Sequence, residues 1–552
     1  MLYSELADVF EKVEGTSKRL EKIEIVSNLL RSLEDDEIPI VVLLTLGKIF
    51  PDGDPRELGV SSRTIKKVLT NLAGLKGEDI VRAHKKTGDL GGAIEILLDK
   101  KSQTTLRESA PLSVRTLYQK LLKLSEYSGE DSMRRKERSL FDIFGKLSPR
   151  EAKYVVRTIL FSMYIGFNEG LMEESISKAF NVKIDLVRRS NQIICDLGEI
   201  ALIAKQEGRE GLEKIKPKPL KPIKPMLAVN ASLDELKGEY AFEYKYDGAR
   251  IQLHRSYDRI KIFSRRLEDV THAFPEIVSE AFEKIEGKEY IIEGEIIAER
   301  MKEKLPFQEL LHRLRRKYDV EEKLKDIPIT LYAFDLLYYK SLNYDSLLKK
   351  PFFQRRGLLE SIIKESDHIK LSHLTITEDM DEIRNLFENA IKQGYEGLMA
   401  KNLKATYSPG IRGKKMLKIK EALDTLDLVI TGAEYGEGRK SKYLSRYFMA
   451  CLNDELIPLA KVSSGLTDQE LEYLTKRLKE LIISEKGRIV QVRPEIVLEI
   501  AFSEIQKSKK YECGYTLRFP RIKRLREDLS IYDVDTLKRV EEIYKIQRRR
   551  AK

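Results

Sequence analysis

The sequence contains no tryptophan, only three cysteines, and no run of eighteen apolar residues. Cys195, Cys451 and Cys513 form no CxxC pair and no zinc-ligand spacing, which excludes a disulfide-stapled scaffold and a four-cysteine zinc site. Residues 1–15 are charged and lack the apolar core of a signal peptide. We therefore expect a protein of a reducing, cytoplasmic compartment that does not span a membrane.

The charge balance is basic. Lys and Arg number 100 against 89 Asp and Glu, giving a net charge of +11 that favours a polyanionic partner, with nucleic acid first. Most of these charges are interspersed and are typical of ordinary solvated faces. The 34% of charged residues and the absence of tryptophan also favour a protein from a thermophilic organism.

A chain of 552 residues is too long for one core and predicts about three or four domains. Residues 1 to about 215 carry helical periodicity, interrupted by a Pro/Gly/Asp loop at 51–55. Ser148, followed by Pro149 and Glu151, has the pattern of a capping box and predicts a helix start. The first region is therefore expected to be all-helical.

The Lys/Pro-rich segment 214–225 predicts an extended linker and a domain boundary. From 226 to about 420, short apolar strands such as 329–334 alternate with helical stretches, which indicates a mixed α/β domain. After 420, strands predominate and one helix is expected to begin at Thr467. This last pattern fits a small barrel with one helix.

Lys245 stands in the motif Lys-Tyr-Asp-Gly, between the strand-like runs 240–244 and 250–254. A lysine that attacks phosphorus must first lose a proton, and keeping a group of pKa near 10.4 neutral at about pH 7.5 costs about 4 kcal/mol, which other cations and desolvation must offset. The motif indicates a covalent nucleotidyl-transfer site. The alternative is a solvated lysine in a hairpin.

Downstream acids and aromatics fall in strand-like contexts. Glu293 and Glu295 flank a glycine on one strand face and could meet magnesium or ribose, or form a solvated acidic edge. Phe334 could stack on a purine or be an ordinary core residue. Glu396 precedes an apolar strand and could supply a second carboxylate for a metal.

Cations complete the pattern. Arg265 follows a strand and could bind a phosphate bidentately, or belong to a surface arginine pair. Lys418 and Lys420 are two residues apart, so a strand would direct both amines the same way, toward a triphosphate. Alternation with Leu417 and Ile419 also fits an ordinary amphipathic strand.

Taken together, these motifs resemble the covalent nucleotidyltransferase superfamily, and specifically the ATP-dependent DNA ligases of archaeal and eukaryotic replicative type. The resemblance spans essentially the whole chain. The matching segments, in order, are EYKYDGAR, FSRRLEDVT, IIEGEIIA, YAFDLLY, EGLMAK, MLKIK and TLRFPRIKRLRED.

The resemblance implies Lys245 as the adenylated nucleophile and Phe334 as the residue that stacks on adenine. The remaining implied roles are adenine-amine recognition by Glu243, contacts to ribose or nick phosphate by Arg250 and Glu295, a nick 5′-phosphate contact by Arg265, nucleotide-phosphate contacts by Arg412 and Lys418, magnesium binding by Glu295 with Glu396, and charge neutralisation by Lys420 and Arg518.

The resemblance further implies a helical DNA-binding domain at 1–216, an adenylation domain at 217–421 and an OB-fold domain at 422–552. ATP and Mg²⁺, with Mn²⁺ as an alternative metal, would be the cofactors, and nicked duplex DNA the partner of a monomer. The implied roles are nick sealing in replication, repair and recombination, in the cytoplasm and at the nucleoid of a prokaryote.

Two departures from the family pattern stand out. Arg526-Glu527-Asp528 is followed by Leu529 where a lysine is usual, which leaves Lys523, Arg524 or Arg526 to contact pyrophosphate. The loop 101–106, comparable to a sliding-clamp peptide, lacks the expected aromatic pair, so a clamp remains only one candidate partner.

Alternatives from other classes stay open at this point. An mRNA-capping guanylyltransferase or an RNA ligase shares the lysine motif, although the large helical region argues against both. An NAD-dependent ligase would be expected to carry a zinc site, and a non-catalytic nucleic-acid clamp would not need the retained acids and lysines.

Overall fold

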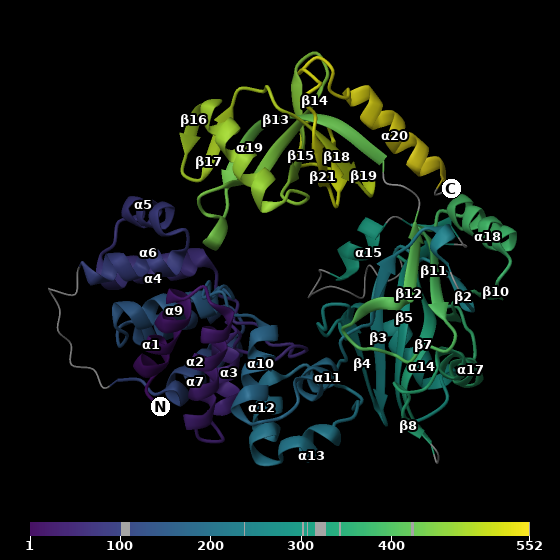
Figure 1. The fold of residues 1–552 in the computed structure, drawn as a ribbon, viewed down its shortest axis with the longest axis horizontal. Coiled ribbons are helices and arrows are strands. Elements are labelled where there is room, and N and C mark those ends of the chain that lie inside the picture. The colour runs from purple at the N-terminus through teal and green to yellow at the C-terminus, as the bar shows by residue number, and fades with distance from the viewer. Residues whose placement is uncertain are drawn as a thin grey trace.

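The structure, a computed structural model, describes residues 1–100, 111–236, 238–300, 303–305, 307–314, 327–341, 344–420 and 424–550. It contains a helical N-terminal domain, a central domain of two sheets and a strand-rich C-terminal domain (Figure 1). The helical and central domains lie side by side, and the C-terminal domain reaches across both (Figure 1). No helix among the described residues is long and apolar enough to cross a membrane.

The N-terminal domain is built from helices around one apolar core. Its elements are α1 (Tyr3–Gly15), α2 (Arg19–Ser32), α3 (Ile38–Thr45), α4 (Ser62–Ala73), α5 (Gly77–Thr87), α6 (Leu90–Asp99), α7 (Val114–Glu126), α8 (Ser132–Phe144), α9 (Pro149–Ile159), α10 (Glu169–Ala179), α11 (Ile184–Ile194), α12 (Leu197–Gln206) and α13 (Gly208–Glu213). The capping box expected at α9 is confirmed: Ser148 accepts a hydrogen bond from the Glu151 amide and the Glu151 side chain accepts one from the Ser148 amide.

The central domain has a five-stranded sheet and a larger, mostly antiparallel sheet. The five-stranded sheet has the order β1 (Leu227–Asn230), β12 (Arg412–Lys420), β11 (Gly397–Asn402), β2 (Tyr240–Tyr244) and β10 (Leu374–Thr377). The larger sheet has the order β4 (Arg259–Ser264), β3 (Ala249–Ser256), β5 (Glu289–Arg300), β7 (Ile329–Ser341) and β8 (Tyr344–Ser346), with β6 (Glu303–Lys304) beside β5 and β9 (Ile369–Leu371) beside β7. The helices are α14 (Pro275–Lys284), α15 (Phe307–Leu314), α17 (Phe352–Ile362) and α18 (Met380–Lys392).

The C-terminal domain is strand-rich, as expected. Its main sheet has the order β15 (Leu456–Val462), β14 (Leu444–Leu452), β13 (Asp424–Tyr435), β17 (Ile489–Val492) and β16 (Ile482–Lys486), and β18 (Val497–Phe502) joins β13 to β21 (Arg521–Leu525). The remaining elements are the ribbon of β19 (Glu504–Lys507) and β20 (Tyr515–Arg518), and the helices α19 (Asp468–Glu480) and α20 (Leu537–Arg550). The helix start at Thr467 is confirmed by a capping box. Closure of these strands into a barrel stays a prediction.

The Lys/Pro segment before Met226 contains no helix or strand after residue 214 but, contrary to expectation, it is not extended throughout: the Lys221 amide donates to the Lys218 carbonyl at 3.2 Å across a turn in which Leu220 has a φ of 69°. Both neighbouring domains hold the segment. The Ile223 amide donates to the Gln252 side chain at 3.0 Å, and that side chain donates back to the Ile223 carbonyl at 2.7 Å. On the helical side, the Lys224 amide donates to the Gln192 carbonyl at 2.9 Å and its side chain pairs with Glu169 at 2.7 Å. One apolar cluster also runs from the N-terminal helices into the central domain, so the two domains share a core.

Candidate active site

Lys245 lies where the chain crosses from one sheet of the central domain to the other. β2 ends at Tyr244 in the five-stranded sheet, and β3 begins at Ala249 in the larger sheet. The hairpin alternative is therefore wrong, because these strands pair with different neighbours rather than with each other. The strand-end placement of Lys245 is confirmed, and its side chain is 21% exposed.

Gly248 lets this crossing approach the larger sheet closely. A Cβ atom at residue 248 would lie 2.2 Å from the Ile296 carbonyl oxygen, a distance that no side chain tolerates. On the other side, the Lys245 amide donates to the Gly397 carbonyl at 2.9 Å and the Glu396 amide donates to the Lys245 carbonyl at 3.0 Å. The Lys245 backbone is thus held against the segment that carries Glu396.

Glu396 joins two of the expected lysines. Its carboxylate lies 2.7 Å from the Lys245 amine and also pairs with Lys420. Burial alone would raise the pKa of Glu396, but the two ammonium groups lower it below its ordinary value. The sequence-predicted nucleophile and metal carboxylate are therefore direct neighbours.

Glu295 faces the same point from the larger sheet. Burial raises the pKa of Glu295 to about 7, partly opposed by Lys245 and Arg250, while Asp247 and Glu396 act in the same direction as burial. This carboxyl group consequently changes charge near neutral pH. Among the described residues, no group of three or more His, Cys, Asp or Glu side chains is arranged to hold a metal.

The predicted cations gather around Lys418. Burial lowers the pKa of Lys418, and the charges of Lys420, Lys245, Arg412 and Arg265 lower it further. These five side chains come from β12, the Lys245 loop and the turn after β4. Such a cluster repels itself unless an anion is bound, so it is suited to phosphate groups.

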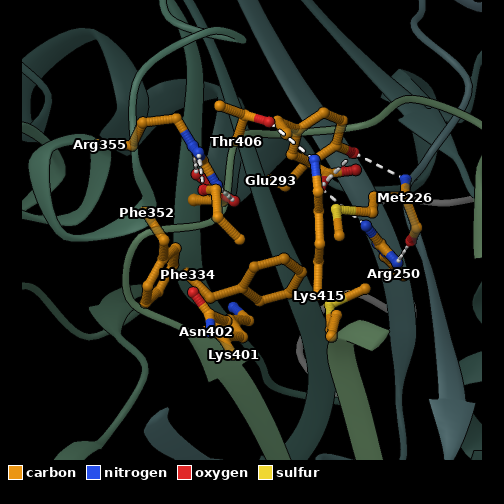
Figure 2. Close-up of a pocket in the computed structure, with 14 residues that line it drawn as sticks. Met226, Arg250, Glu293, Phe334, Phe352, Arg355, Lys401, Asn402, Thr406 and Lys415 are labelled. Carbon is orange, nitrogen blue, oxygen red and sulfur yellow. Dashed lines mark hydrogen bonds and ion pairs between the residues drawn. The ribbon is translucent and has the colours of Figure 1, made fainter. Parts of the chain in front are cut away.

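A pocket opens between the two sheets of the central domain (Figure 2). Phe334 and Lys401 lie together on one side of it and Arg250 lies on the other (Figure 2). Phe334 is half-buried and lines the pocket, which does not fit its alternative as a plain core residue. The lining residues are Met226, Arg250, Glu293, Phe334, Asp335, Phe352, Arg355, Lys401, Asn402, Ala405, Thr406, Tyr407, Lys415 and Met416.

Arg250 is held in place by buried partners. Its guanidinium donates to Glu293 at 2.8 Å and to the Met226 carbonyl at 2.7 Å, while its buried Nε atom has no partner. Glu293 is fully buried and also accepts a hydrogen bond from Tyr407 at 2.8 Å. Glu293 was expected to face magnesium or ribose beside Glu295. This expectation is wrong, because in the structure Glu293 binds the Arg250 guanidinium and holds it in position.

Glu243 is buried on β2, where two hydrogen-bond donors and one further cation face its carboxylate. Ser372 donates to it at 3.0 Å, Arg356 at 3.5 Å, and Lys401 pairs with it at 2.5 Å. Sequence reasoning did not single out these partners, because Ser372 and Lys401 are distant in sequence and Arg356 lies on a helix with no motif. Of these three partners, only Lys401 lies in a segment that the sequence singles out, EGLMAK, of which it is the last residue.

Asp247 connects the site to the C-terminal domain. Arg518, at the end of β20, donates to both carboxylate oxygens of Asp247, at 2.8 and 3.2 Å. Two of the cations expected to contact pyrophosphate in place of a lysine at residue 529 are paired with carboxylates. Arg526 pairs with Asp427 and Asp528, and Arg524 pairs with Glu499. Leu529 itself packs against the apolar cluster that includes Val429 and Val497. The clamp-like loop 101–106 lies outside the described residues.

Comparisons with known proteins give a consistent result over the whole chain. Family models described as DNA ligase N terminus, ATP dependent DNA ligase domain and ATP dependent DNA ligase C terminal region match residues 2–177, 224–420 and 440–529. A DNA ligase of Thermococcus fumicolans is 43% identical over 558 residues, covering 100% of this chain and 99% of the relative. A DNA ligase of Methanopyrus kandleri is 41% identical, covering 99% of both chains.

Solved structures agree on the fold. The structure titled Pmar-Lig_Pre. superimposes with a TM-score of 0.60 at 18% identity, covering 95% of this chain and 99% of that chain. The structure titled Pmar-Lig_PreS3 gives a TM-score of 0.58 at the same identity and covers 94% of this chain and 99% of that chain. Both likenesses extend over all three domains.

Proposed function

This chain belongs to the ATP-dependent DNA ligase family, and from that premise we propose that Lys245 carries AMP from ATP to nicked DNA. Membership decides against the capping-enzyme, RNA-ligase and NAD-ligase alternatives, and it makes the chain an enzyme that seals nicks with ATP. The observation that carries the residue assignment is the position of the Lys245 amine, 2.7 Å from Glu396 and beside the cations of β12.

The reaction has three displacements at phosphorus. The Lys245 amine attacks the α-phosphorus of ATP, so a P–N bond forms, pyrophosphate leaves, and the amine releases its proton to water. An oxygen of the nick 5′-phosphate then attacks the AMP phosphorus and the P–N bond breaks. Finally the 3′-hydroxyl attacks the 5′-phosphorus, which joins the strand and releases AMP.

The other site residues bind and neutralise. Phe334 stacks on adenine from the floor of the pocket, and Glu243 accepts a hydrogen bond from the adenine amine. Arg250 and Glu295 bind the ribose or the nick phosphate, with Arg250 donating from its unpartnered Nε. The phosphate contacts come from the cation cluster of Arg265, Arg412, Lys418 and Lys420.

Glu295 and Glu396 fit a divalent cation. Both are carboxylates next to the nucleophile, and magnesium prefers oxygen ligands from one or two carboxylates together with substrate phosphates. When bound, Mg²⁺ or Mn²⁺ would neutralise charge on the phosphates. Treating the loaded protein with EDTA should therefore abolish AMP transfer, and added Mg²⁺ should restore it.

The division of labour among domains belongs to the same proposal. Residues 1–216 bind duplex DNA, 217–421 carry out adenylation, and 422–552 form an OB-fold barrel that moves between ATP and DNA. We propose a monomer that acts in replication, repair and recombination at the nucleoid of a thermophilic archaeon, in the cytoplasm. A sliding clamp is a further candidate partner.

The decisive test is covalent labelling. Purified protein, stripped of bound AMP, is incubated with magnesium and α-labelled ATP, GTP or NAD and then denatured. An ATP-derived label that is absent from a folded Lys245→Ala variant and that chases onto nicked duplex DNA is the expected result. Absence of label from every nucleotide would refute the proposal and favour a non-catalytic nucleic-acid clamp.

A further inference from the structure

The carboxylate of Glu243 is surrounded by polar side chains that have no place in the reaction steps. Lys401 on β11 pairs with one oxygen at 2.5 Å, and Ser372 donates to the other at 3.0 Å. Arg356 on α17 donates to Ser372 at 2.6 Å and reaches the same Glu243 oxygen at 3.5 Å. All four side chains are buried, with exposed fractions between 2% and 6%.

The Glu243 carboxylate forms ion pairs with two cations, Lys401 and Arg356. An ionised carboxylate can only accept hydrogen bonds and has about four acceptor positions. Ser372 and Arg356 donate to this carboxylate, and Lys401 pairs with it without a hydrogen bond, so about two of these positions remain for a ligand. A purine with a 6-amino group can donate to such a position, whereas a purine with a 6-oxo group would place a second acceptor against it.

Lys401 also touches the aromatic wall of the pocket. Its ammonium nitrogen lies 4.1 Å from the centre of the Phe334 ring and 5.0 Å from the centre of the Phe352 ring. Burial lowers the pKa of Lys401, opposed by the carboxylates of Glu243 and Asp335. One side chain therefore holds both the carboxylate and the ring that the proposed function assigns to the base.

We infer that Lys401, supported by Arg356 and Ser372, is a positioning residue that holds the Glu243 carboxylate as an acceptor and so selects 6-amino over 6-oxo purine nucleotides. This inference rests on the proposed function, in which Glu243 meets the adenine amine. Removing the ammonium group at residue 401 takes away the ion pair that holds the Glu243 carboxylate and the contact with the Phe334 ring, so the carboxylate is no longer fixed where it discriminates between 6-amino and 6-oxo groups.

The test compares ATP with inosine triphosphate, which carries a 6-oxo group and no 2-amino group. Single-turnover labelling of Lys245 is measured for the wild type and for Lys401→Met, Lys401→Arg and Lys404→Met. Lys404 is a matched control because it follows the same strand but is 78% exposed and pairs only with Glu239 among the described residues. Thermal unfolding of each variant checks that it is folded.

In Lys401→Met the ratio of ATP to inosine triphosphate labelling rates should fall by about tenfold or more, the size of one hydrogen bond to a charged group. The ratio for Lys401→Arg should stay close to that of the wild type, and the ratio for Lys404→Met should equal it. Glu243→Gln should lower the ratio similarly, and adding Lys401→Met to it should change the ratio no further. Should Lys401→Met fail to fold, Lys401→Gln is expected to give the same fall.

A folded Lys401→Met or Lys401→Gln variant that labels with ATP and keeps the wild-type ratio would overturn the inference while leaving the ligase reaction intact. A wild type that labels with neither nucleotide would overturn the proposed function and this inference with it. These two failures are distinguished by the wild-type ATP lane alone.

Discussion

The contact between Arg518 and Asp247 should set how often the C-terminal domain closes over Lys245. The pair is bidentate at 2.8 and 3.2 Å, and the two side chains are 12% and 30% exposed. A charge-assisted pair of this kind contributes about 1.5–3 kcal/mol, which corresponds to about a 10- to 150-fold change in the ratio of closed to open molecules.

The expected value lies at the lower end of that range. Arg518 also donates to Glu504 of its own domain at 3.2 Å, a contact that survives opening. The C-terminal domain also contacts the helical domain. The ion pair between Lys85 and Glu485, 53% and 33% exposed, contributes at most about 1 kcal/mol. Beside it, the Tyr164 hydroxyl donates to Glu437 at 3.1 Å and the Gly438 amide donates to the Gly88 carbonyl at 3.5 Å. Arg518→Gln should therefore open the molecule about tenfold, and Lys85→Gln should have a much smaller effect.

Small-angle X-ray scattering without nucleotide measures this equilibrium directly, because Arg518 then has no phosphate to bind. We expect a larger radius of gyration for Arg518→Gln, together with slower formation of the lysine–AMP bond. Sealing of nicked DNA that already carries AMP should be less affected. An unchanged radius for Arg518→Gln, or an equal increase for Lys85→Gln, would show that the pair does not hold the domain closed.

Three further predictions concern stability and reactivity. Glu293→Gln leaves the buried charge of Arg250 without its carboxylate, so the free energy of unfolding in urea should fall by about 3–5 kcal/mol; a loss under about 1 kcal/mol would contradict the role given to this pair. The pKa of Glu169 is lowered to about 2, because Lys224 and Lys48 outweigh its burial. Its stabilisation is thus complete above the unfolded value of about 4.5 and lost as pH falls toward 2, so the melting-temperature deficit of Glu169→Gln should shrink over that window, and no deficit at pH 7 would refute it. All three cysteines are buried, and burial raises the pKa of each thiol, so a thiol reagent should react only after denaturation; rapid reaction of the native protein would argue against this burial.

The elements near the site were predictable where the signal is local. Strand propensity around Lys245 and the caps at Ser148 and Thr467 depend on residues within a few positions of each other, and the structure confirms them. The alternation around Lys418 placed the lysine pair on one strand for the same reason.

The long-range relations were not predictable in the same way. Nothing in the residues around Gly248 indicates that β2 and β3 belong to different sheets, since β2 pairs with the distant strand β11, where Leu398 lies opposite Tyr244, while β3 pairs with β4 and β5. Glu293 and Glu295 look equivalent in the sequence. Only their partners in the structure show that Glu293 anchors Arg250, whereas Glu295 lies near Lys245. The set around Glu243 is assembled from three distant segments and has no sequence pattern of its own.

The Lys/Pro segment before Met226 has a consequence for how the molecule comes apart. Its composition marks a break between domains, yet the backbone there is bonded on both sides and the apolar cluster continues across it. A compositional boundary is therefore not a boundary of cooperative unfolding: the helical and central domains should melt in one transition. Cutting the chain at this segment would expose core surface on both fragments, so neither fragment alone is a faithful substitute for its half of the enzyme.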